Sequence, residues 1–170
     1  MQISAIFIFI CSMIGSAFGA ETADEILVYR GASDASAAVA IDKEMFIVAD
    51  DENNILRVYK ADKGGLPVFS FDMTDFLDIE PEHPEADIEG ATIVGQRIYW
   101  ITSHGRNKEG EMRSNRYRFF ATDVKVENEH VTINPVGRPH KRLIHNLVKV
   151  VESPIPITKV FFEFSQIFWR

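Results

Sequence analysis

The stretch "ADIEGATIVGQRIYWITSHGRNK", residues 86–108, contains two apolar runs separated by the pair Gly95-Gln96. β-Branched and aromatic residues are typical of strands, and a Gly-containing pair between two such runs is typical of a turn. Charged and polar side chains stand at both ends of the stretch. We therefore predict a β-hairpin whose strand ends carry groups capable of chemistry.

An earlier stretch shows the same pattern. Residues 34–54, "DASAAVAIDKEMFIVADDENN", align without gaps over residues 87–107. Apolar positions and the turn position coincide: Ile41 on Val94, Met45 on Ile98, Ile47 on Trp100, and Asp42-Lys43 on Gly95-Gln96. An internal repeat of this kind predicts two copies of one structural unit.

Each copy is expected to form four antiparallel strands. Those of the first copy are Ser36–Ile41, Met45–Asp50, Ile55–Lys60 and Pro67–Phe71. Those of the second copy are Glu89–Val94, Arg97–Thr102, Tyr117–Val124 and Val131–Val136. Four-stranded antiparallel units in tandem are typical of β-propeller blades. We predict an all-β, β-propeller-like fold with two blades, at about residues 34–72 and 87–136, in a domain covering residues 20–137.

Two blades are too few to close a propeller, which needs about four to eight. Three explanations remain open. The chain is part of a larger protein, or it self-associates through its exposed blade edges, or its two sheets pack as a sandwich.

Residues 1–19 carry no charged side chain and include a short apolar core, Ile3–Ile14. Ala17 and Gly19 fit the small–x–small cleavage rule. This predicts a signal peptide over residues 1–19 and a secreted or periplasmic protein without membrane contact after cleavage. An uncleaved membrane anchor is the alternative. The sole cysteine, Cys11, lies in this segment, so the mature chain would have no disulfide and no thiol chemistry.

The net charge of −7 argues against a nucleic-acid partner. The C-terminal part differs from the rest, because residues 138–170 hold six basic and two acidic side chains. A short amphipathic helix is expected where apolar residues recur at helical spacing, at Leu143, Ile144, Leu147, Val148 and Val151. The aromatic tail that follows is interpreted as the start of a missing blade or as misread sequence.

The segments "YRGASDASAAVAIDKEMFIVADDENNILRVY", "PEHPEADIEGATIVGQRIYWITSHGRNK" and "NRYRFFAT" resemble a bacterial family, the domain of unknown function numbered thirty-six sixteen. The resemblance covers about Val28 to Val151. It implies a β-propeller and, because family members are usually longer, a missing second half. No reaction is established for the family. The "DIEG" stretch is also similar to a "DLEG" motif of phytase-like esterase propellers, where such acidic residues approach the channel and calcium.

Asp87 and Glu89 are two residues apart on an expected strand, so their side chains share one face. Two such carboxylates repel each other unless they share a cation or a proton. Asp34 holds the position that matches Asp87. We predict a calcium site from Asp34, Asp87 and Glu89. Alternatively, the two aspartates cap turns, which leaves Glu89, matched by Ser36, as the better functional residue.

A second candidate site lies in "SHGRNK", where His104, Arg106 and Lys108 could bind a small anion such as a phosphate or carboxylate. Alternatively, Arg106 pairs with an aspartate of "ADDENN", residues 49–54. That segment lacks the spacing of a calcium-binding loop and is interpreted as a solvated acidic turn. "PEHPE", with His83 between its prolines, is interpreted as a linker.

Two functions follow as alternatives. One is a secreted, calcium-dependent hydrolase of phosphate or carboxylate esters, in which Asp87 and Glu89 hold calcium while His104 and Arg106 steady the anion. The other is a non-catalytic propeller module that binds a ligand or a protein. The sequence contains no recognisable nucleophile or general base, which favours the second and leaves catalytic residues unassigned.

Overall fold

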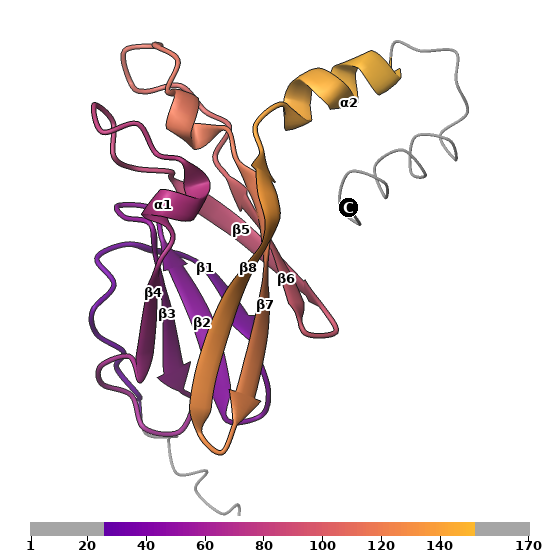
Figure 1. Ribbon diagram of the computed structural model, residues 1–170. Coiled ribbons are helices and arrows are strands. Elements are labelled where there is room, and N and C mark those ends of the chain that lie inside the picture. Colours follow the sequence, from indigo (N-terminus) through magenta and orange to yellow (C-terminus); the bar gives the residue numbers. More distant parts are fainter. Residues whose placement is uncertain (1–25, 152–170) are drawn as a thin grey trace, which may run out of the picture.

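The structure is a computed structural model that describes residues 26–151 (Figure 1). The first sheet contains β1 (Ala35–Ala40), β2 (Met45–Asp50), β3 (Ile55–Lys60) and β4 (Phe69–Asp72). The second sheet contains β5 (Ile88–Val94), β6 (Arg97–Thr102), β7 (Phe119–Glu127) and β8 (His130–His140). The helical elements are α1 (Thr74–Leu77), the 3₁₀ helix η1 (Ser114–Arg116) and α2 (Leu143–Val151).

Strands follow one another in space as they do in sequence, in the orders β1-β2-β3-β4 and β5-β6-β7-β8. All neighbouring strands are antiparallel. The predicted all-β fold, with two four-stranded antiparallel sheets and a short C-terminal helix, is confirmed. The expected signal peptide and aromatic tail lie outside the described residues.

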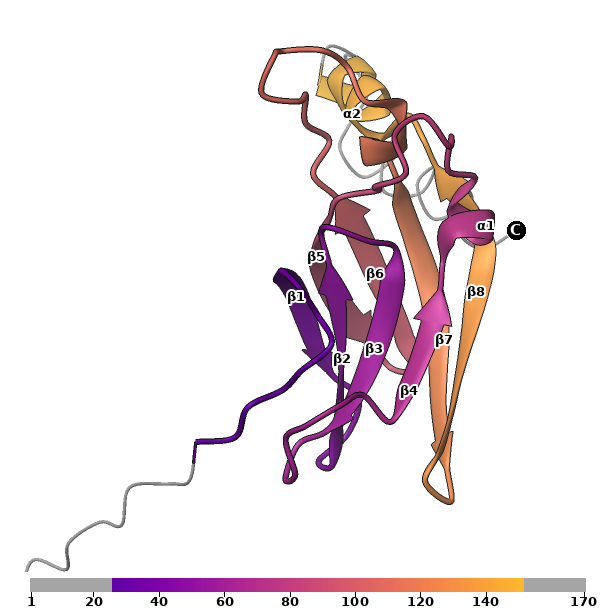
Figure 2. The same ribbon diagram turned by 90° about the vertical axis from the view of Figure 1, so that its left-hand side faces the viewer.

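The apolar core lies between the two sheets, whose inner faces are turned toward each other (Figure 2). Alternate residues of a strand point to the same face, and the buried side chains follow this rule. β2 contributes Ile47 and Ala49, and β6 contributes Ile98 and Trp100. At about 25 cal/mol for each Å² of apolar surface removed from water, this shared core holds the sheets together.

The two sheets meet along their first strands, because β1 packs against β5. The hydroxyl of Ser36 donates a short hydrogen bond to the carbonyl of Ile88 and joins these strands directly. Both strands also shift register near their start, between Ala35 and Ala37 and between Ile88 and Gly90. The end of β2 and the start of β5 also lie close together.

The ungapped alignment is off by one residue in the first strand of each sheet. The alignment places Ala38 over Ala91 and Val48 over Ile101. Because Ala38 pairs with Val48, the alignment predicts that Ala91 pairs with Ile101. In the structure, Ala91 pairs with Trp100. The reason lies in the hairpins. The first closes with a backbone hydrogen bond from Ile41 to Met45, whereas the second closes with a two-residue turn in which Gly95 has φ +64°.

Some predicted boundaries were also wrong. β4 begins at Phe69 and not at Pro67, since proline lacks the N–H that a sheet ladder needs. β8 continues past the predicted end at Val136 to His140, because Gly137 adopts φ +64° at an irregularity in its pairing with β7. The sequence did not indicate the single-turn helix α1.

Residues 81–85, predicted as a linker, lie in a loop that two buried asparagines fix. The Asn54 side chain donates to the Pro84 carbonyl at 2.8 Å and accepts from the Ala86 amide at 2.9 Å. The Asn115 side chain donates to the His83 carbonyl at 2.5 Å and accepts from the Glu80 amide at 3.0 Å. Both asparagines replace water as partners of loop backbone groups, so the loop has one defined conformation.

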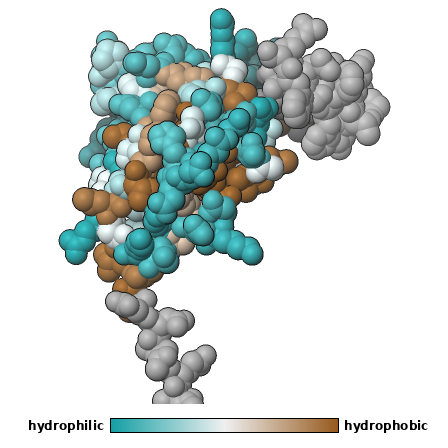
Figure 3. Space-filling model, turned by 60° about the horizontal axis from the view of Figure 1, so that its bottom comes forward, coloured by the Kyte–Doolittle hydropathy of each residue, from teal (hydrophilic) through white to brown (hydrophobic). Residues whose placement is uncertain are grey.

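Exposed apolar side chains gather near the start of the described chain, where residues 26–28 lie beside residues 64–68. Ile26 is 88% exposed, and Leu66 is 71% exposed. Figure 3 shows apolar surface in this region. Self-association remains a prediction.

Among residues 26–151, no helix combines the length and apolarity needed to cross a bilayer.

Candidate functional site

Three carboxylates converge where the two sheets meet. Asp51 directly follows β2, Asp87 directly precedes β5, and Glu89 lies within β5. One carboxylate oxygen from each of them lies within 4.8 Å of the others. The cluster forms because β1 pairs with β2 on one side and packs against β5 on the other.

Asp87 has an unusual backbone and a charged partner. Its φ is +61°, in the left-handed region, and only 8% of the residue is exposed. Its carbonyl accepts a hydrogen bond from the Ser103 amide at 2.8 Å. Its carboxylate forms an ion pair of 3.0 Å with the guanidinium of Arg116. The Asp87 carboxylate therefore pairs with the Arg116 guanidinium and does not cap a turn.

The turn-capping role proposed for the paired aspartates belongs to a different residue. Asp50 is fully buried, and its carboxylate accepts from the amides of Ser33 at 2.7 Å and Glu52 at 3.1 Å. Asp34 instead uses its backbone carbonyl, which accepts from the Asp51 amide at 3.1 Å.

The cluster carries excess negative charge. Burial raises the pKa of the Asp51 carboxyl, and the charges of Asp34 and Asp87 raise it further. The pKa of Glu89 is raised by burial and then by Asp87, Asp51 and Asp34, while Arg116 opposes the rise. One carboxylate oxygen of Asp51, Oδ1, is buried without a hydrogen-bond partner among the described residues. A cation would satisfy this oxygen and relieve the repulsion.

The predicted metal ligands are thus partly brought together. Asp87 and Glu89 lie in the cluster, while Asp34 lies close enough to add charge but does not join it. Asp51 takes the third position. It belongs to "ADDENN", and the prediction of a solvated turn there was wrong for Asp50 and for Asn54, which is 5% exposed. The signal that could have revealed Asp51 is its position immediately after a strand that ends beside Asp34.

Of the predicted anion-binding residues, His104 is the most enclosed. Its Nδ1 lies 2.9 Å from the Thr102 carbonyl oxygen, an acceptor, so Nδ1 carries the proton. Its Nε2 is buried without a hydrogen-bond partner among the described residues. The ring packs edge-on against Tyr117, with 5.5 Å between ring centroids.

Arg106 and Lys108 are exposed and point to local partners. Arg106 donates to the Gly110 carbonyl at 2.9 Å, and not to an aspartate of residues 49–54. Lys108 lies 3.8 Å from Glu109. Within residues 26–151, no hydrogen bond or ion pair joins either residue to His104. The predicted anion site is therefore spread along the loop.

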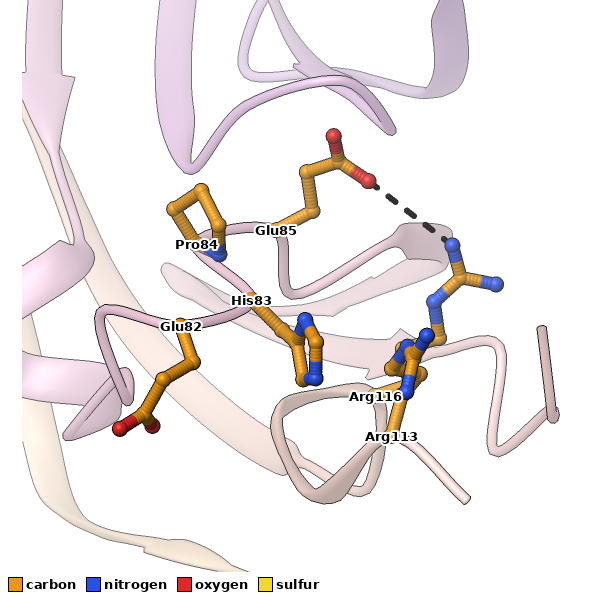
Figure 4. A pocket seen from close by; sticks show the side chains of 6 residues that line it. All are labelled: Glu82, His83, Pro84, Glu85, Arg113 and Arg116. Carbon is orange, nitrogen blue, oxygen red and sulfur yellow. Dashed lines mark ion pairs between the residues drawn. The ribbon is translucent and has the colours of Figure 1, made fainter. Parts of the chain in front are cut away.

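Arg116, which pairs with Asp87 of the acidic cluster, also lines a small cavity (Figure 4). Its volume is about 130 Å³, and it is lined by Glu82, His83, Pro84, Glu85, Arg113 and Arg116. Arg116 also stands 3.8 Å from the Glu85 carboxylate. Sequence reasoning missed both arginines, because they are far from His83 along the chain. Their Arg-x-x-Arg spacing was the available signal.

Fold and cluster together define an all-β protein of two packed, four-stranded antiparallel sheets with an acidic group at their junction. The family described as Protein of unknown function (DUF3616) matches residues 34–135. The chain belongs to this family, as its motifs predicted. No curated protein and no solved structure matches the chain, and nothing supports the similarity to phytase-like esterase propellers.

Proposed function

We propose that this chain is a calcium-binding, β-propeller-like module of an exported protein. The observation that carries the proposal is the convergence of Asp51, Asp87 and Glu89 within 4.8 Å. Calcium binds six to eight oxygens at about 2.3–2.6 Å, so oxygens bound to one ion lie at most about 5 Å apart. The spacing of the three carboxylates meets this condition. Backbone carbonyls and water would complete the shell.

The β-propeller part of the proposal rests on how the sheets meet. Their first strands, β1 and β5, lie next to each other, and their apolar faces pack together. Innermost strands of adjacent propeller blades have this relation around the central channel. On this proposal the acidic cluster stands at one end of that channel. The proposal of export rests on the composition of residues 1–19.

Arg116 is the group with which calcium must compete. In the metal-free protein its guanidinium neutralises part of the cluster through Asp87. Calcium binding to Asp87 would replace this ion pair. We therefore expect calcium to bind with moderate affinity. This affinity should fall at higher salt concentration, because salt screens the attraction between calcium and the carboxylates of Asp34 and its neighbours.

The test is calorimetric titration of calcium into the full chain. Glu89→Gln and Asp51→Asn should each weaken binding at least tenfold, because each removes a charged ligand. Glu44→Gln is the matched control, since Glu44 is exposed and its charge acts on Lys60 instead. Wild-type affinity in both cluster variants would refute the calcium site.

A second candidate function is calcium-dependent hydrolysis of phosphate or carboxylate esters. One observation favours it: Glu89 is exposed at the carboxylate cluster, so a substrate from solvent could reach a calcium ion held there. The assay is hydrolysis of p-nitrophenyl phosphate and p-nitrophenyl acetate with calcium or with chelator. Turnover that needs calcium and is lost in Glu89→Gln would support catalysis. No turnover of either ester in either buffer would count against this second candidate.

A further inference from the structure

We propose that the cavity bounded by residues 82–85, Arg113 and Arg116 binds a small anion of the phosphate class. The site differs from the predicted anion site at residues 104–108. The proposal does not require calcium to be bound, although Arg116, which lines the cavity, also pairs with Asp87 of the acidic cluster.

The two arginines are brought together at η1. Arg113 is the extended residue directly before η1, and Arg116 is the last residue of η1. Both line the cavity beside the ring of His83 (Figure 4). Asn115, between the arginines, is fully buried and faces the loop backbone instead. Three nitrogen-bearing side chains thus surround one small space.

The opposite wall of the cavity is built before any ligand arrives. Asn115 holds the carbonyl of His83, and Asn54 holds the carbonyl of Pro84. The two hydrogen bonds hold the consecutive carbonyl groups of His83 and Pro84, and so fix the backbone that carries the His83 ring. A preformed wall lowers the entropy lost on binding, which is a property of ligand sites more than of solvated linkers.

The arginines keep unused donors. A guanidinium carries five N–H groups. Among the described residues, the Arg113 side chain donates one hydrogen bond, to Glu111 at 2.9 Å. Arg116 pairs with Asp87 at 3.0 Å, while Glu85 is beyond hydrogen-bond distance at 3.8 Å. A phosphate oxygen can therefore replace Glu85 at Arg116 and reach Arg113, with charge-assisted bonds to both.

The size and charge of the cavity limit the ligand. A water molecule needs about 10–15 Å³ of cavity volume, so a cavity of about 130 Å³ has room for a small anion such as one phosphate group. Glu82 also lines the cavity, but Figure 4 shows its carboxylate turned away from the arginines. Two guanidinium groups favour a dianion over a monocarboxylate.

The experiment is titration of inorganic phosphate into the full chain, followed by calorimetry and phosphorus NMR, in low-chloride buffer with chelator. Arg113→Gln should weaken phosphate binding at least tenfold, and His83→Gln several-fold. Arg106→Gln is the matched control and should stay within twofold of wild type. Circular dichroism verifies that each variant is folded. Chelator removes calcium, so failure of the calcium proposal would not affect this result.

Three results would overturn the inference. The first is no phosphate binding by wild type at millimolar concentration. The second is wild-type affinity in Arg113→Gln. The third is a loss in Arg106→Gln as large as that in Arg113→Gln, which would place the anion at residues 104–108. Acetate serves as the second probe, and acetate binding as tight as phosphate binding would refute the phosphate class.

Discussion

Asp51→Asn should change the thermal stability of the chain in opposite directions with and without calcium. In chelator, Asp51 repels Asp87 and Glu89 from within 4.8 Å. At that distance two unit charges repel by about 0.9 kcal/mol in a water-like dielectric and by about 3.5 kcal/mol at an effective value of 20. Glu89 is exposed and Arg116 pairs with Asp87, so the smaller value applies. The variant should gain about 1 kcal/mol.

Calcium should reverse this order. A ligand at one hundred times its dissociation constant stabilises the native state by about 2.7 kcal/mol. For a chain of this size, about 1 kcal/mol shifts Tm by roughly 2–4 °C. Asp51→Asn should therefore melt a few degrees above wild type in chelator and below it in saturating calcium.

The assay is thermal unfolding followed by circular dichroism, with Glu44→Gln as control in both buffers. The Tm difference between Glu44→Gln and wild type should be the same with and without calcium, because Glu44 is exposed and its charge acts on Lys60 and not on the cluster. The reasoning is refuted if Asp51→Asn melts below wild type in chelator. It is equally refuted if calcium raises the Tm of both proteins by the same amount.

Three further predictions concern stability. Asn115→Ala should lower the free energy of unfolding by about 2 kcal/mol in urea denaturation, because it removes three part-buried hydrogen bonds to the loop backbone at residues 80 and 83; an unchanged midpoint would contradict this. Arg118→Met should cost about 3 kcal/mol or more, since the buried guanidinium donates to the carbonyls of residues 77, 78 and 114, and a neutral effect would show that water replaces it. In chelator, the pKa values of Asp51 and Glu89 are higher in the folded state than the unfolded values of 3.8 and 4.5, so the folded state binds more protons. The stability that these two groups contribute is fully present below the unfolded pKa values. It is lost as pH rises through the raised pKa values of the folded state. The difference in unfolding free energy between wild type and the double variant Asp51→Asn/Glu89→Gln should therefore shrink on acidification, and a difference that grows as pH falls would refute the sign.

The strands were predictable because their signal is local. β2, β3 and β6 match the predicted bounds, since β-branched and aromatic runs between turn residues depend on near neighbours alone. The alignment register was less secure. The two hairpins close differently, so the strand register differs by one residue and Ala91 pairs with Trp100. An alignment without gaps cannot detect this difference.

The candidate site was predictable only in part. Asp87 and Glu89 are close in sequence, and strand alternation predicted a shared face, although Asp87 in fact precedes β5 with a left-handed φ of +61°. Asp51 joins them through packing of β1 against β5, which no local pattern encodes. Arg116 reaches the cluster from a loop between β6 and β7 that the sequence showed only as polar.

The sequence by itself determined the existence and order of the strands, the antiparallel hairpins and the family, because hydrophobic alternation and turn chemistry act over a few residues. Tertiary structure alone decided which charges face each other. Burial of one shared core fixes the approach of the two sheets, and that approach brings Asp51 to Glu89. The hydrogen bonds of Asn54 and Asn115 likewise turn residues 82–85 from a linker into the wall of a cavity. These contacts join residues distant in the chain, so their geometry depends on the packing of the whole fold.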